Sequence, residues 1–395
     1  MTGLVPNARS RRIEASATLA ITAEAARLKA EGHDVVSLGA GEPDFPTPEP
    51  IARAGIEAIE RHDYRYTAAA GTPALRKAGA AWLGEQFGLD YAADEVMVSS
   101  GAKGALHMAL DTIVEPGDRV LILAPYWVSY PALVTMADGE PFVVAALPQR
   151  GFIHDEATLE KAAADSGASG VIVNWPNNPS GAVPSRHDVQ ALVDLCARRD
   201  MWIVSDEIYA TLLYDGAQHI SPANVPGGRE RTVVVSGFTK SHTLTGWRTS
   251  FMAGPKDVIA AAGRIQSQVL GNPCTISQAA MQKACELPLP DDQATRMQAF
   301  GERRAFLLER INAIPGMSLA PPKGAFYALI DIRPICEQRG IDDFTVCRQL
   351  LEQQHLALVP GSAFAAPGFI RASYAASLET LQKAVERLEK WVQGA

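Results

Sequence analysis

Between about residues 94 and 290 the sequence alternates short apolar runs with longer amphipathic stretches. Four of the runs are Val120–Ala124, Gly170–Asn174, Trp202–Ser205 and Thr232–Ser236. They are apolar at consecutive positions, so we expect strands that are buried on both faces. Such strands lie in a mainly parallel sheet whose faces are covered by helices, for example one over residues 185–199. The sequence therefore predicts an α/β fold.

The two ends of the chain have a different pattern. Helical stretches such as residues 296–314 and 378–392 occur there around short strands. A length of 395 residues exceeds the usual size of one domain. We therefore expect two domains: a large one over 46–290 and a smaller α+β one. The smaller one combines 1–45, with a mobile N-terminal segment, and 291–395.

Composition excludes several classes of function. The net charge is −8 and no long basic run is present, which argues against a nucleic-acid partner. No apolar run reaches the roughly 20 residues of a membrane-spanning helix, so no membrane association is expected. The five cysteines are odd in number and form no C-x-x-C pair, which favours a reducing, cytoplasmic location. The eight histidines lack metal-ligand spacing, so no metal is expected.

Polar and aromatic residues follow the predicted strands. Asp206 and Tyr209 come where one apolar run ends, Asn178 lies in a turn after another, and Trp127 follows a third. Ligands of open α/β sheets bind outside the carboxyl ends of the strands. An aspartate there can keep a heterocyclic nitrogen protonated, and a nearby phenol can contact the same ligand. Each of these residues alone would equally fit a purely structural role, as a helix cap, a loop residue or an aromatic residue of the core.

Lys240 follows a further apolar strand, and Arg248 lies eight residues beyond it. A lysine that is desolvated near another cation has a lowered pKa and becomes a nucleophile, while an arginine can bind a phosphate bidentately. Residues 99–104 form a glycine-containing turn before a helical stretch over 105–113. Backbone N–H groups at such a helix start can hold an anion. Each feature alone would also fit a solvated charge or an ordinary turn.

Two other motifs are weak. Ser100–Lys103 matches the S-x-x-K pattern of penicillin-recognising enzymes, but neither S-D-N nor K-T-G is present. Gly39-Ala40-Gly41 begins like a dinucleotide fingerprint, yet Asp44 takes the place of the third glycine and two prolines follow. We reject a dinucleotide site.

Together the segments resemble the class I aminotransferases, which are fold-type I pyridoxal-phosphate enzymes, and in particular their bacterial aspartate aminotransferase branch. The seven most specific segments occur in the family's order: 39–45, 125–131, 178–181, 205–209, Lys240 with 245–248, 323–327 and 371–374. The match runs nearly from end to end.

The resemblance implies a role for each matching residue. The catalytic residues would be Lys240, which would carry pyridoxal 5′-phosphate as a Schiff base, with Asp206 at the pyridinium nitrogen and Tyr209 at the phenolic oxygen. Further cofactor contacts would come from Gly101, Ala102, Lys103, Trp127, Asn178, Arg248 and Tyr66. The substrate would be bound by Arg371, Gly41, Asn178, Trp127, Lys103, Ser16 and Thr18.

The resemblance also implies an activity and an assembly. The enzyme would move an amino group from an amino acid to a 2-oxo acid, in a homodimer whose Tyr66 reaches the neighbouring subunit's phosphate. Ser16, Thr18 and Lys103 match positions associated with acidic side chains, so the donor would be acidic and aspartate-like. Thr239 and His242 depart from the family pattern beside Lys240, which leaves the substrate open.

Three alternative functions compete with this hypothesis. Aromatic amino acids or prephenate could be the substrates, and a pyridoxal-phosphate-dependent cysteine–sulfur lyase would use the same residues. The ligand-sensing module of certain transcription regulators is similar too, but those proteins carry an added DNA-binding domain for which we expect no room here.

Overall fold

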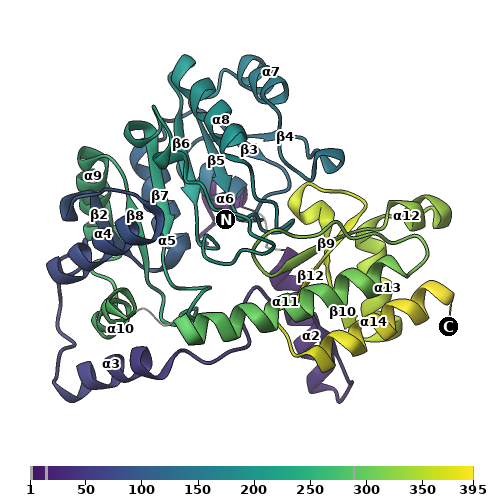
Figure 1. The fold of residues 1–395 in the computed structure, drawn as a ribbon. Helices are drawn as coiled ribbons and strands as arrows, with labels where there is room; N and C mark the ends of the chain where they lie inside the picture. The colour runs from purple at the N-terminus through teal and green to yellow at the C-terminus, as the bar shows by residue number, and fades with distance from the viewer. Residues whose placement is uncertain (1–2, 14–16, 288–289, 395) are drawn as a thin grey trace.

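A computed structural model describes residues 3–13, 17–287 and 290–394 (Figure 1). Its largest sheet has seven strands in the order β2-β8-β7-β6-β5-β3-β4. The strands are β2 (Val96–Ser99), β3 (Arg119–Leu123), β4 (Glu140–Val144), β5 (Gly170–Asn174), β6 (Trp202–Asp206), β7 (Thr232–Ser236) and β8 (Ser250–Ala253). β8 runs antiparallel to both of its neighbours, β2 and β7, and the other neighbouring strands in this sheet are parallel. The predicted mainly parallel sheet is confirmed.

Helices cover both faces of this sheet, as the apolar runs require (Figure 1). On one face Ile172 and its neighbours pack against α5 (Gly101–Ile113), α6 (Tyr130–Met136) and α9 (Lys256–Val269). On the other face Val171 and Val173 pack against α7 (Glu156–Ser166) and α8 (Arg186–Arg198). Successive strand residues point to opposite faces, so a strand covered on both sides must be apolar throughout. The remaining helices at this end are α3 (Glu49–Glu60), α4 (Pro73–Phe87) and α10 (Thr275–Glu286).

A second core surrounds two small sheets. Antiparallel strands β9 (Tyr327–Asp331), β11 (Val359–Pro360) and β12 (Phe369–Ser373) form one, and parallel β1 (Val36–Ser37) and β10 (Leu356–Ala357) form the other. The helices here are α2 (Ala17–Ala30), α11 (Pro290–Asn312), α12 (Arg333–Arg339), α13 (Asp343–Gln354) and α14 (Leu378–Gln393), and α1 (Ala8–Arg11) precedes them. Pairing of β1 with β10 joins the two ends of the chain.

The expected fold class, a large α/β domain with a smaller α+β domain, is confirmed. We propose that the domain boundaries lie as the sequence suggests, at 46–290 for the large domain and 1–45 with 291–395 for the small one. The support is the path of α11, which extends from beside α10 toward α13 and α14 (Figure 1). Its residues Phe300 and Leu307 are buried in the small core.

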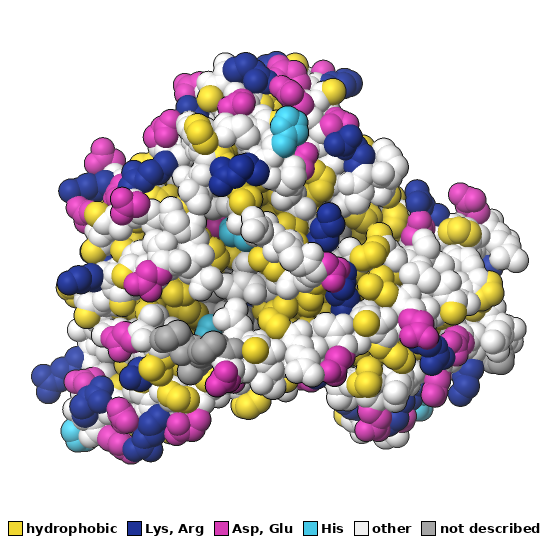
Figure 2. All heavy atoms as spheres, viewed as in Figure 1, with side chains coloured by type: hydrophobic (Ala, Val, Ile, Leu, Met, Phe, Trp, Pro, Cys, Tyr) yellow, Lys and Arg dark blue, Asp and Glu magenta, His cyan; other side chains and the backbone are white. Residues whose placement is uncertain are grey.

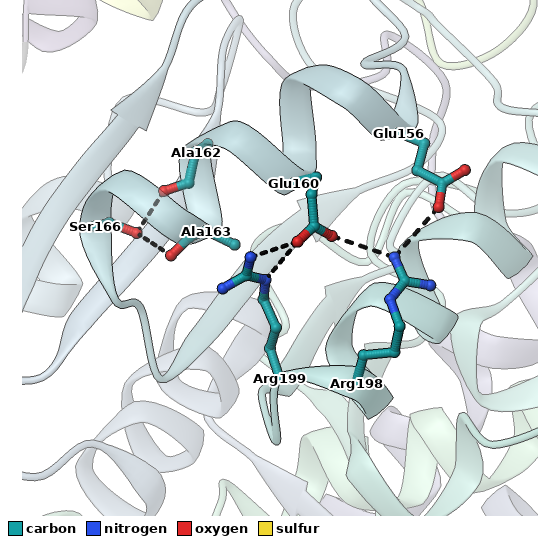
Figure 3. A network of polar contacts seen from close by, with 7 residues as sticks. All are labelled: Glu156, Glu160, Ala162, Ala163, Ser166, Arg198 and Arg199. Carbon is teal, nitrogen blue, oxygen red and sulfur yellow. Dashed lines mark hydrogen bonds and ion pairs between the residues drawn. The ribbon is translucent and has the colours of Figure 1, made fainter.

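The face of the molecule shown in Figure 2 carries positive and negative side chains side by side. On the outer helices α7 and α8, for example, Glu160 accepts hydrogen bonds from Arg198 at 3.2 Å and from Arg199 Nε at 2.9 Å (Figure 3). Exposed pairs of this kind contribute little to stability. Among the described residues, no helix has the length and apolar character needed to cross a membrane. Within the same residues, no group of histidine, cysteine and acidic side chains could hold a metal ion.

Candidate active site

A pocket of about 270 Å³ opens at the carboxyl ends of the central strands, between the two cores. Ten of the candidate site residues line it: Gly41, Ala102, Lys103, Trp127, Asn178, Asp206, Tyr209, Lys240, Arg248 and Arg371. The parallel strands bring the turns that follow them to one edge of the sheet, and β12 supplies Arg371 from the small core.

Asp206 ends strand β6 and is buried. Its Oδ2 accepts a hydrogen bond from the Tyr130 hydroxyl at 2.8 Å, and its Oδ1 accepts one from the Ile208 N–H at 3.3 Å. Burial raises the pKa of Asp206 to about 6, although the two hydrogen bonds act against that rise. The carboxyl group is therefore fixed in direction and shielded from water, as a partner for a ring nitrogen must be.

Tyr130 is a residue that the sequence analysis missed. It is the first residue of α6 and is buried against the sheet. Its segment, 125–131, was noted as a motif, but the contact with Asp206 spans 76 positions. The only local signal is a tyrosine at a helix start just after a strand end.

Lys240 lies in the turn after β7, and its Nζ donates a hydrogen bond to the carbonyl oxygen of Gly41. Burial lowers the pKa of Lys240 to about 8; Arg248 and Arg371 lower it as well, against the opposing effect of Glu42. An amine that loses its proton near neutral pH is available as a nucleophile and as a base.

The first turn of α5 forms a cradle with Arg248. Gly101 begins this helix at a φ of +77°, and a Cβ on it would lie 2.5 Å from Arg248 Nη2. Only glycine allows this approach. Lys103, in the same first turn, has its pKa lowered by burial and by Arg248. Because α5 turns its free N–H groups toward the same place, the cradle suits a phosphate-sized anion. The helix begins at Gly101, four residues earlier than the stretch from Ala105 that we expected, so the predicted start was wrong.

Arg371 is buried, with 2% of its surface exposed. Its Nη1 donates to Asn178 Oδ1 at 3.0 Å and its Nη2 to the Gly39 carbonyl oxygen at 2.7 Å, but its Nε has no hydrogen-bond partner. Among the described residues, no carboxylate forms an ion pair with it. A buried cation without a counter-charge is costly, so the site favours a carboxylate ligand.

The residues present fit pyridoxal phosphate. A phosphate matches the cradle that a Cβ at Gly101 would fill, and a ring nitrogen matches the fixed carboxyl group of Asp206. Trp127 supplies an aromatic face, over which Lys103 Nζ lies 5.0 Å from the ring centroid. The buried amine of Lys240 suits covalent attachment.

Of the four remaining candidate residues, Gly101 belongs to the cradle with Arg248, and Tyr66 is not among the residues that line the pocket. Tyr66 is 99% exposed. Ser16 lies outside the described residues, and Thr18 falls in α2, where its side chain is likewise not described. The two unusual neighbours of Lys240 contact the surrounding protein: Thr239 donates to the Thr249 carbonyl oxygen at 3.2 Å, and His242 packs edge-on against Phe238.

The chain is similar to known proteins over almost its whole length. The family described as Aminotransferase class I and II matches residues 33–388. An aspartate aminotransferase from Geobacillus stearothermophilus is 41% identical over 382 residues, which cover 96% of each chain. A bifunctional aspartate aminotransferase and glutamate/aspartate-prephenate aminotransferase from Petunia hybrida is 41% identical over 96% of this chain and 81% of its own.

Solved structures are similar in the same way. The aspartate aminotransferase of Rhizobium meliloti matches with a TM-score of 0.95 and 38% identity, covering 99% of both chains. The aspartate aminotransferase of Thermus thermophilus with maleate matches with a TM-score of 0.92 and 39% identity, covering 99% of this chain and 100% of that one.

Proposed function

Because this chain belongs to the class I and II aminotransferases, we propose that it transfers the amino group of an acidic, aspartate-like amino acid to a 2-oxo acid. The chain is a transaminase that uses pyridoxal 5′-phosphate. The support for this substrate is the pocket, which combines a buried amine, a buried carboxyl group and a buried guanidinium group whose Nε has no hydrogen-bond partner.

The cofactor would be held from several sides. Lys240 would carry it covalently, Trp127 would stack on its ring, and Tyr209 and Asn178 would donate to its phenolic oxygen. Its phosphate would lie against Arg248 and residues 101–103. When bound, the cofactor supplies a ring that withdraws electrons from the substrate Cα.

Two side chains would control protons. The Asp206 carboxylate would hold a proton on the ring nitrogen that faces it, because a fixed negative charge in a shielded site stabilises that proton. Lys240 Nζ, once the substrate amino group has displaced it from the cofactor, would take the proton from the substrate Cα. Its pKa of about 8 allows the neutral amine to form near neutral pH.

The substrate would be oriented by its carboxylates. The planar fork of Arg371 would bind the α-carboxylate through two parallel hydrogen bonds. Gly41 would lie beside the substrate, and its lack of a side chain lets the Tyr327 hydroxyl approach, because a Cβ there would lie 2.6 Å from that oxygen. Lys103, with Ser16 and Thr18, would bind the acidic side chain.

The observation that carries the proposal is the buried Lys240 amine in one pocket with Asp206 and Arg371. In the purified protein with pyridoxal phosphate, Lys240→Ala should abolish both the visible absorbance of the covalently attached cofactor and transamination. Lys161→Ala, a change of an exposed lysine on α7, is the control. Retained activity in Lys240→Ala would refute the proposal.

A half-reaction screen then ranks the donors. The cofactor-loaded protein is mixed with aspartate, glutamate or an aromatic amino acid, and the loss of the visible band is followed. Aspartate should react fastest, and Lys103→Ala should slow acidic donors selectively. Equal losses for every donor would contradict the acidic assignment, and pyruvate release from cysteine without an oxo acid would indicate a lyase.

Prephenate is a second candidate, as an amino acceptor. The support is that two similar proteins, from Petunia hybrida and Thermus thermophilus, are named as prephenate aminotransferases as well as aspartate aminotransferases. Incubating the aminated cofactor form with prephenate or with 2-oxoglutarate, and comparing the return of the visible band, decides between them.

We also propose that the protein is a homodimer with shared active sites. Tyr66 is exposed and is not among the residues that line the pocket of its own chain, and α3 exposes Ile56 by 46% and Ile59 by 50%. Sedimentation would give the dimer mass. Mixing Lys240→Ala with Tyr66→Ala should restore part of the activity if each subunit completes the other's site. A cytoplasmic location stays a prediction.

A further inference from the structure

Tyr327 lies where the two cores meet at the pocket. It begins strand β9, is 1% exposed, and lines the pocket. In the antiparallel pair of β9 with β12, Tyr327 lies opposite Ser373. Arg371 is two residues from Ser373, so its side chain emerges on the same face and diagonally next to Tyr327. The strand register therefore places an aromatic ring beside the substrate-binding arginine.

The ring of Tyr327 contacts the Arg371 guanidinium group. The Cζ atom of Arg371 is 4.7 Å from the centroid of Tyr327 and 4.8 Å from that of Phe364. Arg371 has no carboxylate partner among the described residues, so these two rings and two hydrogen bonds hold the fork in place. An aromatic face stabilises a desolvated cation and fixes its plane.

The hydroxyl group of Tyr327 contacts Tyr209, which follows strand β6 of the large sheet. Its oxygen lies 2.8 Å from the hydroxyl oxygen of Tyr209, and either group could donate in this hydrogen bond. Burial raises the pKa of both tyrosines, so both hydroxyls keep their protons. Arg371, which lies against the Tyr327 ring, only donates and offers no acceptor. If Tyr209 donates to an acceptor in the pocket, the arrangement that satisfies both hydroxyls has Tyr327 donating to Tyr209.

We propose that Tyr327 is a positioning residue for this enzyme: its hydroxyl group orients the Tyr209 proton toward the cofactor's phenolic oxygen, and its ring orients Arg371. The proposal rests on the proposed function, which gives Tyr209 that contact. Chains of hydrogen bonds strengthen one another, so a donor behind Tyr209 makes Tyr209 a better donor. Gly41 belongs to the same arrangement, because a side chain there would displace the Tyr327 hydroxyl.

The charged and titratable groups around Tyr209 are Asp206, Lys240, Arg371 and Tyr327. Only Tyr327 can be altered by the loss of a single oxygen without changing a formal charge. Tyr327→Phe removes the hydroxyl group and keeps the ring, whereas Tyr327→Leu removes both. The two parts of the proposal can therefore be tested separately.

The hydroxyl group is tested by a pH titration of the visible absorbance of the cofactor attached to Lys240. When Tyr209 donates less strongly, the phenolic oxygen bears more uncompensated negative charge and the protonated form is favoured. In Tyr327→Phe the midpoint should rise by about half a pH unit, while KM for the amino donor changes by less than about twofold. In Tyr327→Leu the KM should rise about tenfold, because the ring beneath Arg371 is lost.

Tyr214→Phe is the matched control. Tyr214 is a buried tyrosine of the same core whose hydroxyl donates to the Ala325 carbonyl oxygen at 2.7 Å, and it does not line the pocket. Its loss should leave the midpoint where it is. An equal shift in this variant would overturn the proposal, since it would show a general effect of removing a buried hydroxyl group.

A double variant separates positioning from direct contact. If Tyr327 acts through Tyr209, adding Tyr327→Phe to Tyr209→Phe should produce no further shift of the midpoint. A shift of the same size in both backgrounds would overturn the proposal, as would an unmoved midpoint in Tyr327→Phe alone. If the unmodified protein shows no visible band with pyridoxal phosphate, the proposed function itself fails, and this inference fails with it.

Discussion

The two halves of the pocket are built in different ways. The half that would face the cofactor, with Asp206, Tyr209 and Lys240, comes from turns directly after the adjacent strands β6 and β7. The half that would face the substrate joins distant parts of the chain: Gly39 and Arg371 are 332 positions apart and are linked by one hydrogen bond. The order of the parallel strands alone brings the residues of the first half together. The residues of the second half meet only when the N-terminal and C-terminal parts of the chain pair through β1 and β10.

The halves also differ in how their charges are satisfied. The Asp206 carboxylate already has two donors, whereas Arg371 has only neutral acceptors and an unpaired Nε. The first half is therefore prepared before any ligand arrives, while the second lacks an anion that a substrate would bring. We expect changes in the first half to lower kcat and changes in the second to raise KM.

The largest effect is expected from Asp206→Asn. An amide cannot hold a proton on the ring nitrogen by charge, so kcat should fall about a thousandfold while KM stays within a few-fold. Steady-state kinetics with aspartate and 2-oxoglutarate measures both. Asp215→Asn, which alters an exposed partner of Arg304, should leave both unchanged. A change confined to KM would break the division between the two halves.

The next effect concerns Glu207, which follows Asp206 in the sequence. Glu207 turns away from the pocket into a buried network, where its carboxylate accepts from Ser205 at 2.8 Å and Ser221 at 2.6 Å, and lies 2.8 Å from His219 Nε2. Glu207→Ala leaves these partners unsatisfied and should lower the free energy of unfolding by about 3 kcal/mol. Urea unfolding measures this. Glu160→Ala, in the exposed network of Figure 3, should barely move the urea midpoint. Equal changes in the free energy of unfolding would show that the buried network contributes no more to stability than the exposed one.

Arg371→Lys tests the substrate half. Lysine keeps the charge but loses the planar fork, so kcat/KM should fall about a hundredfold, mainly through KM. The affinity for pyridoxal phosphate should not change. Arg333→Lys, at an exposed pair with Asp331, controls for the loss of a guanidinium group in the same domain. A fall in kcat alone would show that Arg371 contributes to the chemical step and not to substrate binding.

The sequence predicted the cofactor half better than the substrate half, for physical reasons. An apolar run followed by a polar residue is a local pattern, so the strands and the turns carrying Asp206 and Lys240 could be found from the residues. Residues 99–104 have the pattern of a glycine-containing turn, and glycine disfavours a helix, so the sequence does not predict that α5 begins as early as Gly101. The motif 323–327 was noticed only through the family resemblance.

The contacts of Tyr327 and Tyr130 could not be predicted from the sequence. Tyr327 meets Tyr209 across 118 positions, and Tyr130 meets Asp206 across 76. Neither pair has a local signature, because each depends on how two layers pack. The two-residue strands β1 and β10 are too short to show any alternation, so their pairing was not expected either.

The smallest effect is expected from Tyr130→Phe, and it tests whether the cofactor half is prepared before a ligand binds. Burial raises the pKa of Asp206 in the cofactor-free protein to about 6, and the hydrogen bond from Tyr130 opposes that rise. Only the ionised carboxylate attracts a protonated ring nitrogen, so affinity for pyridoxal phosphate should be full above that pKa and fall as the pH drops through it. Removing the phenol's hydrogen bond should raise this pKa further and move the fall in affinity upward by about half to one pH unit.

Equilibrium binding of the cofactor to the cofactor-free protein between about pH 5 and 8 measures the shift in Tyr130→Phe. Tyr126→Phe, which alters a half-buried neighbour, should not move it. An unshifted profile in Tyr130→Phe would mean that the cofactor itself orders Asp206, and the contrast between a prepared half and an incomplete half would no longer hold.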